Sequence, residues 1–546
     1  MRGPAQPDIE SLPRRRLGRQ LLVLLALVAI SVAARLPTLN RPLAEHHEWL
    51  TATVVRNLEI WHADGALADG LQPIFSYPGA ANKHIDNQSS GLADGTGNYY
   101  YTSYPVGGYV APYAAFWALR VSPTVLGLQL FNLAAEAVVV LLLFGLVRRL
   151  LPTPRDGPAF AAATAYLFTA ETLWYHSNAY MSDMLAQTAF VLTLWAAVLW
   201  FDPEANRVRR SALPAALLAF ALTEWLSLFV GGTLVLYALV TRRRRIATTV
   251  VVGSSCGFAV GLTGWQFARI AGLRALGTAS TAKYALRSGY GVASASESGG
   301  IGQQLATLAR YYRAGYLPLI ALATGLGLLA VVLAALSRRN PAWPVAPGVA
   351  PRWAELRLVA LLTTVPVLAH HAVFLDFSAQ HDFAVLKAGF ALSIGVGLGV
   401  GLVLRHAPGP RLRRAVAAVI AFGLIGSSGY STRQYLRTER ATATAGYQRV
   451  GADIRRQAGP DEVVFLRVPG ATAEQVNGFL TPQVVLAAHR NIEPLTWTAE
   501  PGLAPAAREL IQRNGTGRGV VFTLDPGVVH SADDARVVAV DRFVVG

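Results

Sequence analysis

The chain has 546 residues, of which 53% are hydrophobic and 15% are charged, and its mean hydropathy is +0.37. This composition is far too apolar for a soluble protein of this length and indicates a polytopic membrane protein. The net charge of +16 does not indicate a nucleic-acid partner, because the basic residues lie at the ends of apolar runs and not in one patch. The single cysteine, Cys256, excludes an intrachain disulfide and a cysteine-based metal cluster.

Arginine clusters mark the ends of the apolar runs. They are Arg14 to Arg16 with Arg19; Arg148 and Arg149; Arg207, Arg209 and Arg210; Arg242 to Arg245; Arg338 and Arg339; and Arg405 with Arg411, Arg413 and Arg414. Cytoplasmic loops are enriched in Lys and Arg, so we expect all of these clusters on the cytoplasmic side. The apolar sequence between them then predicts about eleven transmembrane helices of ~17 to 25 residues each. The abundance of Ala, Arg, Gly and Val favours a bacterial plasma (inner) membrane.

The apolar segments are predicted in chain order. Residues 1–20 form a basic cytoplasmic N-terminus, and residues 21–34 form an uncleaved first helix with Arg35 reaching the far interface. Further helices are expected at 126–147, 159–174, 184–201, 246–268, 316–336, 356–375, 383–404 and 415–430. The segment 211–241 is short for two crossings, but a single crossing would place Arg242 to Arg245 outside. We therefore expect a tight or partly re-entrant pair around Glu224, within a membrane domain that spans residues 21–430.

Two polar stretches and a soluble tail are predicted on the extracytoplasmic side. The first loop, 35–125, contains a helical pattern from His46 to Trp61 and an aromatic interfacial helix within 101–120. A second loop covers 269–315. In the tail, 431–546, short Val-rich strands are predicted to alternate with helical stretches. The strands are EVVFLRV, PQVVLAA, GVVFTLD and RVVAVDRFVV. The predicted fold class is thus a mainly α polytopic membrane protein with a small C-terminal extracytoplasmic α/β domain.

Ionisable residues gather at the extracytoplasmic ends of the predicted helices. They are Glu45, His46, His47, Glu48, Glu171, His176, Asp183, Glu224, Asp376, His381, Asp382 and Lys387. Polar groups at membrane depth are costly and usually functional, although a single one can simply mark where a helix meets water. Adjacent histidines without the HExxH spacing do not favour zinc, so we predict no metal.

Four segments resemble a known family. HHEWLTATVVRN (46–57) resembles the first-loop signature of bacterial GT-C glycosyltransferases related to the protein O-mannosyltransferase and aminoarabinose transferase group. YPVGGYVAPYAAFWALR, ETLWYHSNAYMSDMLA and QHDFAVLKAGFAL are similar to further segments of that group. Leu50 and Thr51 stand where the family pattern has Arg-Gln, Tyr104 stands where it has His, and the usual first-loop Asp is missing from its place.

The resemblance implies transfer of a sugar from a polyprenyl-phosphate donor to an acceptor hydroxyl on a glycolipid, a cell-envelope glycan or a protein. A carboxylate must take the acceptor proton, for which we expect Glu48 or, as the weaker candidate, Glu45. Cations must stabilise the leaving phosphate, and no cofactor is required. The substrate-binding residues are predicted to be His47, Arg56, Tyr101, Tyr104, His176, Asp183, His381, Asp382 and Lys387. The tyrosines also fit an interfacial aromatic belt.

Two other classes of protein fit part of the pattern. A transporter or flippase for a lipid-linked substrate would also use intramembrane charges, but it should show midplane charges and repeated halves. A catalytically inactive assembly subunit would explain the missing first-loop Asp. The placement of charges at the outer helix ends favours the enzyme.

Overall fold

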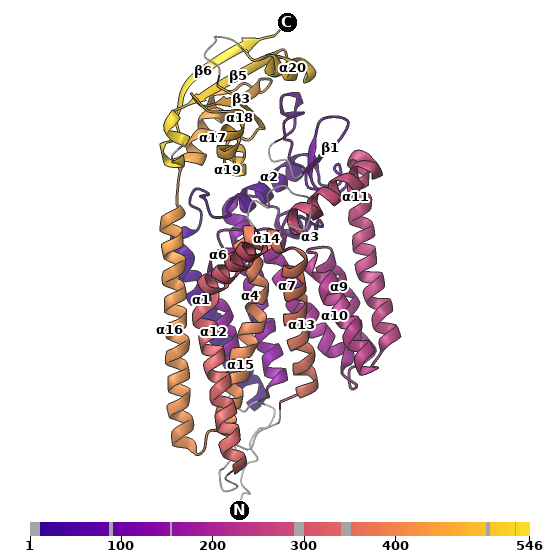
Figure 1. The fold of residues 1–546 in the computed structure, drawn as a ribbon, viewed down its shortest axis with the longest axis vertical. Helices are drawn as coiled ribbons and strands as arrows, with labels where there is room; N and C mark the ends of the chain where they lie inside the picture. The colour runs from indigo at the N-terminus through magenta and orange to yellow at the C-terminus, as the bar shows by residue number, and fades with distance from the viewer. Residues whose placement is uncertain are drawn as a thin grey trace, which may run out of the picture.

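The computed structural model describes residues 11–86, 91–152, 156–288, 300–339, 351–497, 503–529 and 531–545. Long helices form a bundle, and a small α/β domain covers one end of it (Figure 1). The fold is therefore mainly helical with a small C-terminal mixed sheet, as the sequence predicts.

Within the described residues, eight helices are long and apolar enough to cross a membrane. They are α1 (Ser11–Arg35), α4 (Val125–Leu150), α7 (Ser182–Phe201), α11 (Arg245–Ser288), α12 (Ile301–Arg339), α13 (Trp353–Val373), α15 (Gly389–His406) with the preceding 3-10 helix η3 (Asp382–Ala388), and α16 (Pro410–Thr442). The other predicted segments form shorter helices, namely α5 (Gly157–Leu167), α9 (Ala212–Ala221) and α10 (Leu226–Thr241). Every predicted segment is thus helical, but these three fall short of the ~17 residues that a full crossing needs.

The segment 211–241 folds as a helical pair that breaks at Glu224 between α9 and α10. Its two ends lie close together. Arg210, before the pair, donates to the Asp202 carbonyl at 3.1 Å, and the guanidinium of Arg244, after it, lies 5.3 Å from the Trp200 ring. Because Trp200 and Asp202 are both at the end of α7, the pair returns to the side from which it starts.

The arginine clusters meet at one end of the bundle, which we call the arginine end. Arg149, at the end of α4, binds Asp202 at 2.7 Å and Glu355, at the start of α13, at 2.9 Å. Arg148 donates to Gln20 on α1 at 3.0 Å. The helices α7, α10 and α15 all end here, so the residues at the starts of these helices lie at the opposite end, which we call the far end.

Arg35 does not reach an interface, and that prediction is wrong. Its side chain is fully buried and binds Glu136 of α4 through two hydrogen bonds of 2.7 and 2.8 Å. It also donates to the carbonyls of Thr172 and Leu173 in α6 (Ala170–Tyr175), both at 3.0 Å. A buried ion pair needs such additional hydrogen bonds to offset its loss of hydration. Arg35 thus joins α1, α4 and α6 inside the bundle.

The first loop contains two longer helices, α2 (Trp49–Asp64) and α3 (Gly107–Leu119), as predicted from the sequence. Its shorter elements are η1 (Leu36–Thr38), η2 (Ala80–Asn82) and a hairpin of β1 (Gly91–Ala93) with β2 (Tyr99–Tyr101). Eleven residues of α2 are buried. This burial is more than an amphipathic surface helix would have, because the C-terminal domain covers its outer side through α19 (Pro482–Ala488).

The predicted second loop, 269–315, is largely helical. The helix α11 continues to Ser288 and α12 begins at Ile301. Gly272 has φ +84°, a conformation that favours glycine, and it changes the direction of α11. The second half of α11 therefore turns over the far end of the bundle, where it contacts α14 (Leu375–Gln380).

The C-terminal domain has a four-stranded sheet of order β4-β3-β5-β6, in which only the β5-β6 pair is antiparallel. Its elements are α17 (Gly446–Gln457), β3 (Val463–Arg467), α18 (Ala473–Phe479), α19, β4 (Ile492–Leu495), α20 (Pro505–Arg513), β5 (Arg518–Leu524), η4 (Pro526–Val529), η5 (Ala532–Asp534) and β6 (Val537–Val544). The segment PQVVLAA, predicted as a strand, is the helix α19 because Pro482 occupies its first turn, where a missing N–H costs nothing. The boundary predicted at 431 falls inside α16, which continues to Thr442.

The C-terminal domain packs against the first loop. Gln483 donates to the Ala44 carbonyl at 2.7 Å, and Asn514 donates to the Lys83 carbonyl at 2.9 Å. Ala81 and Ile85 belong to one apolar cluster with residues of the domain, including Phe465. The domain and the first loop therefore form one continuous layer over the far end.

We expect this layer to be extracytoplasmic. A cysteine in place of Ala506, which is exposed on α20, should react in intact cells with a membrane-impermeant maleimide. The native Cys256 is 8% exposed and lies within a candidate span, so the wild-type chain serves as a low-background control. Labelling only after the cells are lysed would place the domain in the cytoplasm.

Candidate functional site

The far end of the bundle gathers charged and aromatic side chains from several segments. The 3-10 helix η3 has two of them, Asp382 and Lys387, in only seven residues. A 3-10 helix longer than three or four residues is uncommon and often marks a functional segment. Since η3 lies directly before α15, its position is fixed by a helix that returns to the arginine end.

The side chains of two histidines on a strained turn contact the Asp382 carboxylate. His46 Nε2 lies 3.3 Å from Asp382 Oδ2, and His47 Nε2 lies 3.2 Å from Asp382 Oδ1, which also accepts the hydroxyl of Tyr175. His46 and His47 have φ of +46° and +65°, a left-handed conformation that is costly for residues other than glycine. Such strain persists where the surrounding structure holds it, often at functional sites. The His47 Nδ1 atom is buried and has no hydrogen-bond partner among the described residues.

Lys387 lies between two buried carboxylates. Its Nζ is 2.7 Å from Asp183 Oδ1, in the first turn of α7, and 3.7 Å from Glu224 Oε1, which precedes α10. All three side chains are at most 2% exposed. Burial alone would raise the pKa of Glu224, but Lys387 and His370 lower it. Both carboxylates also lie at helix N-termini, where the backbone favours negative charge.

Arg287 offers a cation without an anionic partner. Its guanidinium lies 5.4 Å from the Tyr104 ring and 5.1 Å from the Phe377 ring. No carboxylate or other hydrogen-bond partner of this guanidinium is found within the described ranges. The His381 ring is 4.7 Å from Phe377 and 5.6 Å from His47, so one chain of ring contacts joins Arg287 to the histidine turn.

Glu48 lies on the same turn, but its side chain points to other partners. Arg41 binds both of its carboxylate oxygens, at 2.7 and 2.9 Å, and the Ala44 N–H and the Asn178 amide also donate to them. Burial raises the pKa of Glu48, although Arg41 opposes that shift. The weaker candidate, Glu45, is exposed and accepts from Tyr447 of the C-terminal domain at 3.5 Å. The structure thus places the two predicted carboxylates away from Asp382.

Arg56 is fully buried in α2, and none of its three side-chain nitrogens has a hydrogen-bond partner in the described part of the chain. Its guanidinium lies 4.5 Å from the Phe75 ring. Burial lowers the pKa of Arg56 to about 10, opposed by Tyr77 and Tyr109. An unpaired buried guanidinium is costly, so this position favours an anion or ordered water beside it.

Of the remaining predicted site residues, Tyr101 and Tyr104 lie beside Arg287, while His176 lies inside the bundle. Tyr101 and Tyr104 are buried and stacked with ring centroids 6.4 Å apart, which brings them to Arg287. His176 is fully buried, and both ring nitrogens have partners, the Tyr166 hydroxyl at 3.2 Å and the Asn132 amide oxygen at 3.3 Å. Burial lowers the pKa of His176 to about 3. Both ring nitrogens of His176 are therefore already used within the bundle.

Several residues of the far end escaped the sequence prediction. Arg41 and His370 lie outside the quoted motifs, and Tyr175 lies within ETLWYHSNAYMSDMLA without being singled out; the contacts of each were identified only in the fold. Within the described ranges, no group of three or more His, Cys, Asp or Glu side chains is placed to hold a metal ion.

The fold is that of the GT-C membrane glycosyltransferases. ArnT from Cupriavidus metallidurans bound to undecaprenyl phosphate aligns with a TM-score of 0.58 at 14% identity, over 95% of this chain and 97% of that one. The Archaeoglobus fulgidus oligosaccharyltransferase in its apo form aligns with a TM-score of 0.51 at 12% identity, over 92% of this chain and 69% of that one. The Archaeoglobus fulgidus AglB in complex with an inhibitory peptide and a dolichol-phosphate aligns with a TM-score of 0.50 at 11% identity, over 92% of this chain and 69% of that one. No protein-family model and no curated protein sequence matches the chain.

Proposed function

We propose that this protein transfers a sugar from a polyprenyl-phosphate donor to an acceptor hydroxyl at the far end of its bundle. One observation supports this most directly: a chain of ring contacts through Phe377 and His381 joins the unpaired guanidinium of Arg287 to His47, which is paired with Asp382. The first can bind a phosphate and the second can take a proton. The bound undecaprenyl phosphate of ArnT and dolichol-phosphate of AglB favour the same class of donor.

The reaction requires one proton acceptor. When His47 Nε2–H donates to Asp382, the unpartnered Nδ1 can present a lone pair to the acceptor. The acceptor oxygen attacks the anomeric carbon, the C–O bond to phosphate breaks, and the leaving phosphate takes the bonding electrons. The hydroxyl proton passes to His47 Nδ1, and Asp382 stabilises the resulting imidazolium.

The leaving phosphate requires a cation. Arg287 is suited to this role because a guanidinium binds two phosphate oxygens at once and this one has no competing carboxylate. Lys387 adds positive potential, but Asp183 already binds its Nζ. We therefore propose that Arg287 binds the leaving phosphate and that Lys387 holds the neighbouring side chains of the site in place.

Glu48 remains the carboxylate predicted from the sequence. Four donors already surround its two oxygens, so we propose that Glu48 positions the histidine turn instead of accepting the substrate proton. Tyr101 and Tyr104 are proposed to pack against the sugar, and His381 to line the same space.

The test is the fate of a polyprenyl-phosphate-linked sugar added to the full chain in nanodiscs. We expect release of polyprenyl phosphate together with glycosylation of an acceptor from the host envelope. Arg287→Ala should raise the KM for the donor by roughly tenfold to hundredfold, the worth of a charged hydrogen-bond pair. Arg274→Ala, an exposed arginine on the same half of α11, should not change it.

The alternatives give different results. An intact donor that appears in the other leaflet, without phosphate release, would identify a flippase. Donor binding without turnover in the wild-type chain would identify an inactive subunit. Equal KM values for Arg287→Ala and Arg274→Ala would remove Arg287 from the phosphate site.

A further inference from the structure

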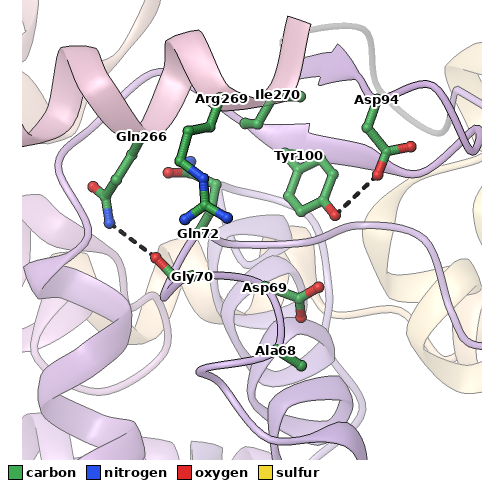
Figure 2. Close-up of a pocket in the computed structure, with 9 residues that line it drawn as sticks. All are labelled: Ala68, Asp69, Gly70, Gln72, Asp94, Tyr100, Gln266, Arg269 and Ile270. Carbon is green, nitrogen blue, oxygen red and sulfur yellow. Dashed lines mark hydrogen bonds between the residues drawn. The ribbon is translucent and has the colours of Figure 1, made fainter.

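A second pocket lies in the layer above the bundle, outside the site just described. It has a volume of about 170 Å³ and is lined by Ala68, Asp69, Gly70, Gln72, Asp94, Tyr100, Gln266, Arg269 and Ile270. Figure 2 shows these side chains around it, with Arg269 extending from α11 toward the loop that contains Gly70. The pocket is therefore formed where the first loop meets α11.

Close contacts hold the walls of the pocket in place. Gly70 has φ +62°, a conformation that favours glycine, and a Cβ atom there would come within 2.9 Å of the Arg269 guanidinium. Gln266 Nε2 donates to the Gly70 carbonyl at 3.2 Å. On the other wall, Asp94 accepts from the Tyr100 hydroxyl at 3.2 Å and from the backbone of its own turn.

The lining presents hydrogen-bond acceptors that lack donors. Gln72 and Gln266 are 2% and 5% exposed, and the amide oxygen of each has no partner within the described ranges. Their NH₂ groups are already used, on the Tyr101 and Gly70 carbonyls, so the amides cannot turn to satisfy these oxygens. The Asp69 carboxylate likewise makes no hydrogen bond to a described residue. An acceptor without a donor is unfavourable, and a ligand rich in hydroxyl donors would supply donors to the Asp69 carboxylate.

We propose that this pocket binds one pyranose ring of a carbohydrate. The Asp69 carboxylate and the Arg269 guanidinium line a space that is small compared with the roughly 300–1,000 Å³ of pockets for drug-sized ligands, so a single ring fits. The ring of Tyr100 forms part of the wall and can pack against the sugar. A phosphate is disfavoured, because Asp69 and Asp94 would repel it.

The position of the pocket suggests which sugar it holds. Tyr100 and Tyr101 are neighbours in β2, and successive side chains of a strand point to opposite sides. Tyr100 lines the pocket, while Tyr101 stacks on Tyr104 in the far-end site. The two sites thus share β2 as a wall. The pocket is suited to a non-reacting sugar of a glycan acceptor, an assignment that rests on the proposed function.

Binding can be measured without turnover. The probes are methyl α-glucopyranoside, methyl α-mannopyranoside and methyl β-galactopyranoside, added to the full chain in nanodiscs free of maltoside detergent and followed by saturation-transfer NMR. At least one glycoside should bind, and Asp69→Asn should weaken its binding by roughly tenfold. Asp64→Asn is the matched control, since Asp64 is exposed, lies five residues away and does not line the pocket.

The same experiment has a pH dependence. Burial raises the pKa of Asp69 to about 6, aided by Asp64 and Asp94 and opposed by Lys83, and Arg269 lines the same pocket. Hydrogen bonds to Asp94 keep its pKa below the usual value, so Asp94 stays ionised near pH 6. Affinity should therefore fall as the pH is lowered from about 7.5 to about 5, and this fall should be absent in Asp69→Asn.

Three results would overturn the proposal: no glycoside binds, glycerol binds as well as the glycosides do, or Asp69→Asn binds like the wild type. Glycoside binding by a chain that shows no transferase activity would support the pocket and reject the proposed function. Transferase activity without glycoside binding would support the proposed function and reject the pocket.

Discussion

Replacement of His47 by glutamine is expected to lower the turnover number by roughly 10²–10⁴-fold, the usual contribution of a general base. The glutamine amide can still donate a hydrogen bond to Asp382, so the turn should keep its shape. It cannot accept a proton. The KM for the donor should therefore change little, because Arg287 and the tyrosines are untouched. Single-turnover assays on the purified variant, with its melting temperature measured alongside, would show this separation.

Two further variants identify the proton acceptor. His46→Gln is the matched control, because His46 contacts the same carboxylate at 3.3 Å, and its turnover should fall much less. Glu48→Gln should lower turnover and melting temperature together, since it weakens the Arg41 contact that holds the turn. If Glu48→Gln abolishes turnover at wild-type stability while His47→Gln remains active, Glu48 is the base.

The backbone of the bundle was predictable because it depends on properties that lie along the sequence. Apolar length identified each helical segment, and the arginine clusters identified the end at which they meet. The return of the pair around Glu224 followed from the same clusters. Elements were missed where local composition is ambiguous. PQVVLAA has the residues of a strand but begins as a helix with Pro482, and the polar second half of α11 gives no apolar signal.

The sequence predicted which polar residues lie at the far end, but not how they pair. The segment QHDFAVLK correctly marked Asp382 and Lys387 as residues of the far end. Which carboxylate meets which cation depends on contacts between segments distant in sequence, such as Lys387 with Asp183. Arg35 shows the same limit, because its position at a helix end suggested an interface while its partner Glu136 lies on another helix. Sequence reveals a costly polar group, but only the fold reveals what offsets its cost.

Replacement of Lys387 by methionine should destabilise the protein by about 3–5 kcal/mol, the usual cost of removing one partner from a buried ion pair. The loss leaves the carboxylates of Asp183 and Glu224 buried without their shared cation. A large fall in melting temperature in nanodiscs is therefore expected, together with loss of transferase activity.

A double-mutant cycle separates the two effects of this lysine. In Lys387→Met with Asp183→Asn, only Glu224 remains charged, and it keeps its contacts with His370 and the Leu226 N–H. The double variant should be more stable than Lys387→Met alone, because a neutral amide tolerates burial better than a carboxylate does. Its activity should stay low, since the cation that adds positive potential near the phosphate is still absent. Equal melting temperatures for the single and double variants would show that Asp183 and Lys387 are not coupled, and recovery of activity with stability would show that Lys387 acts only through folding.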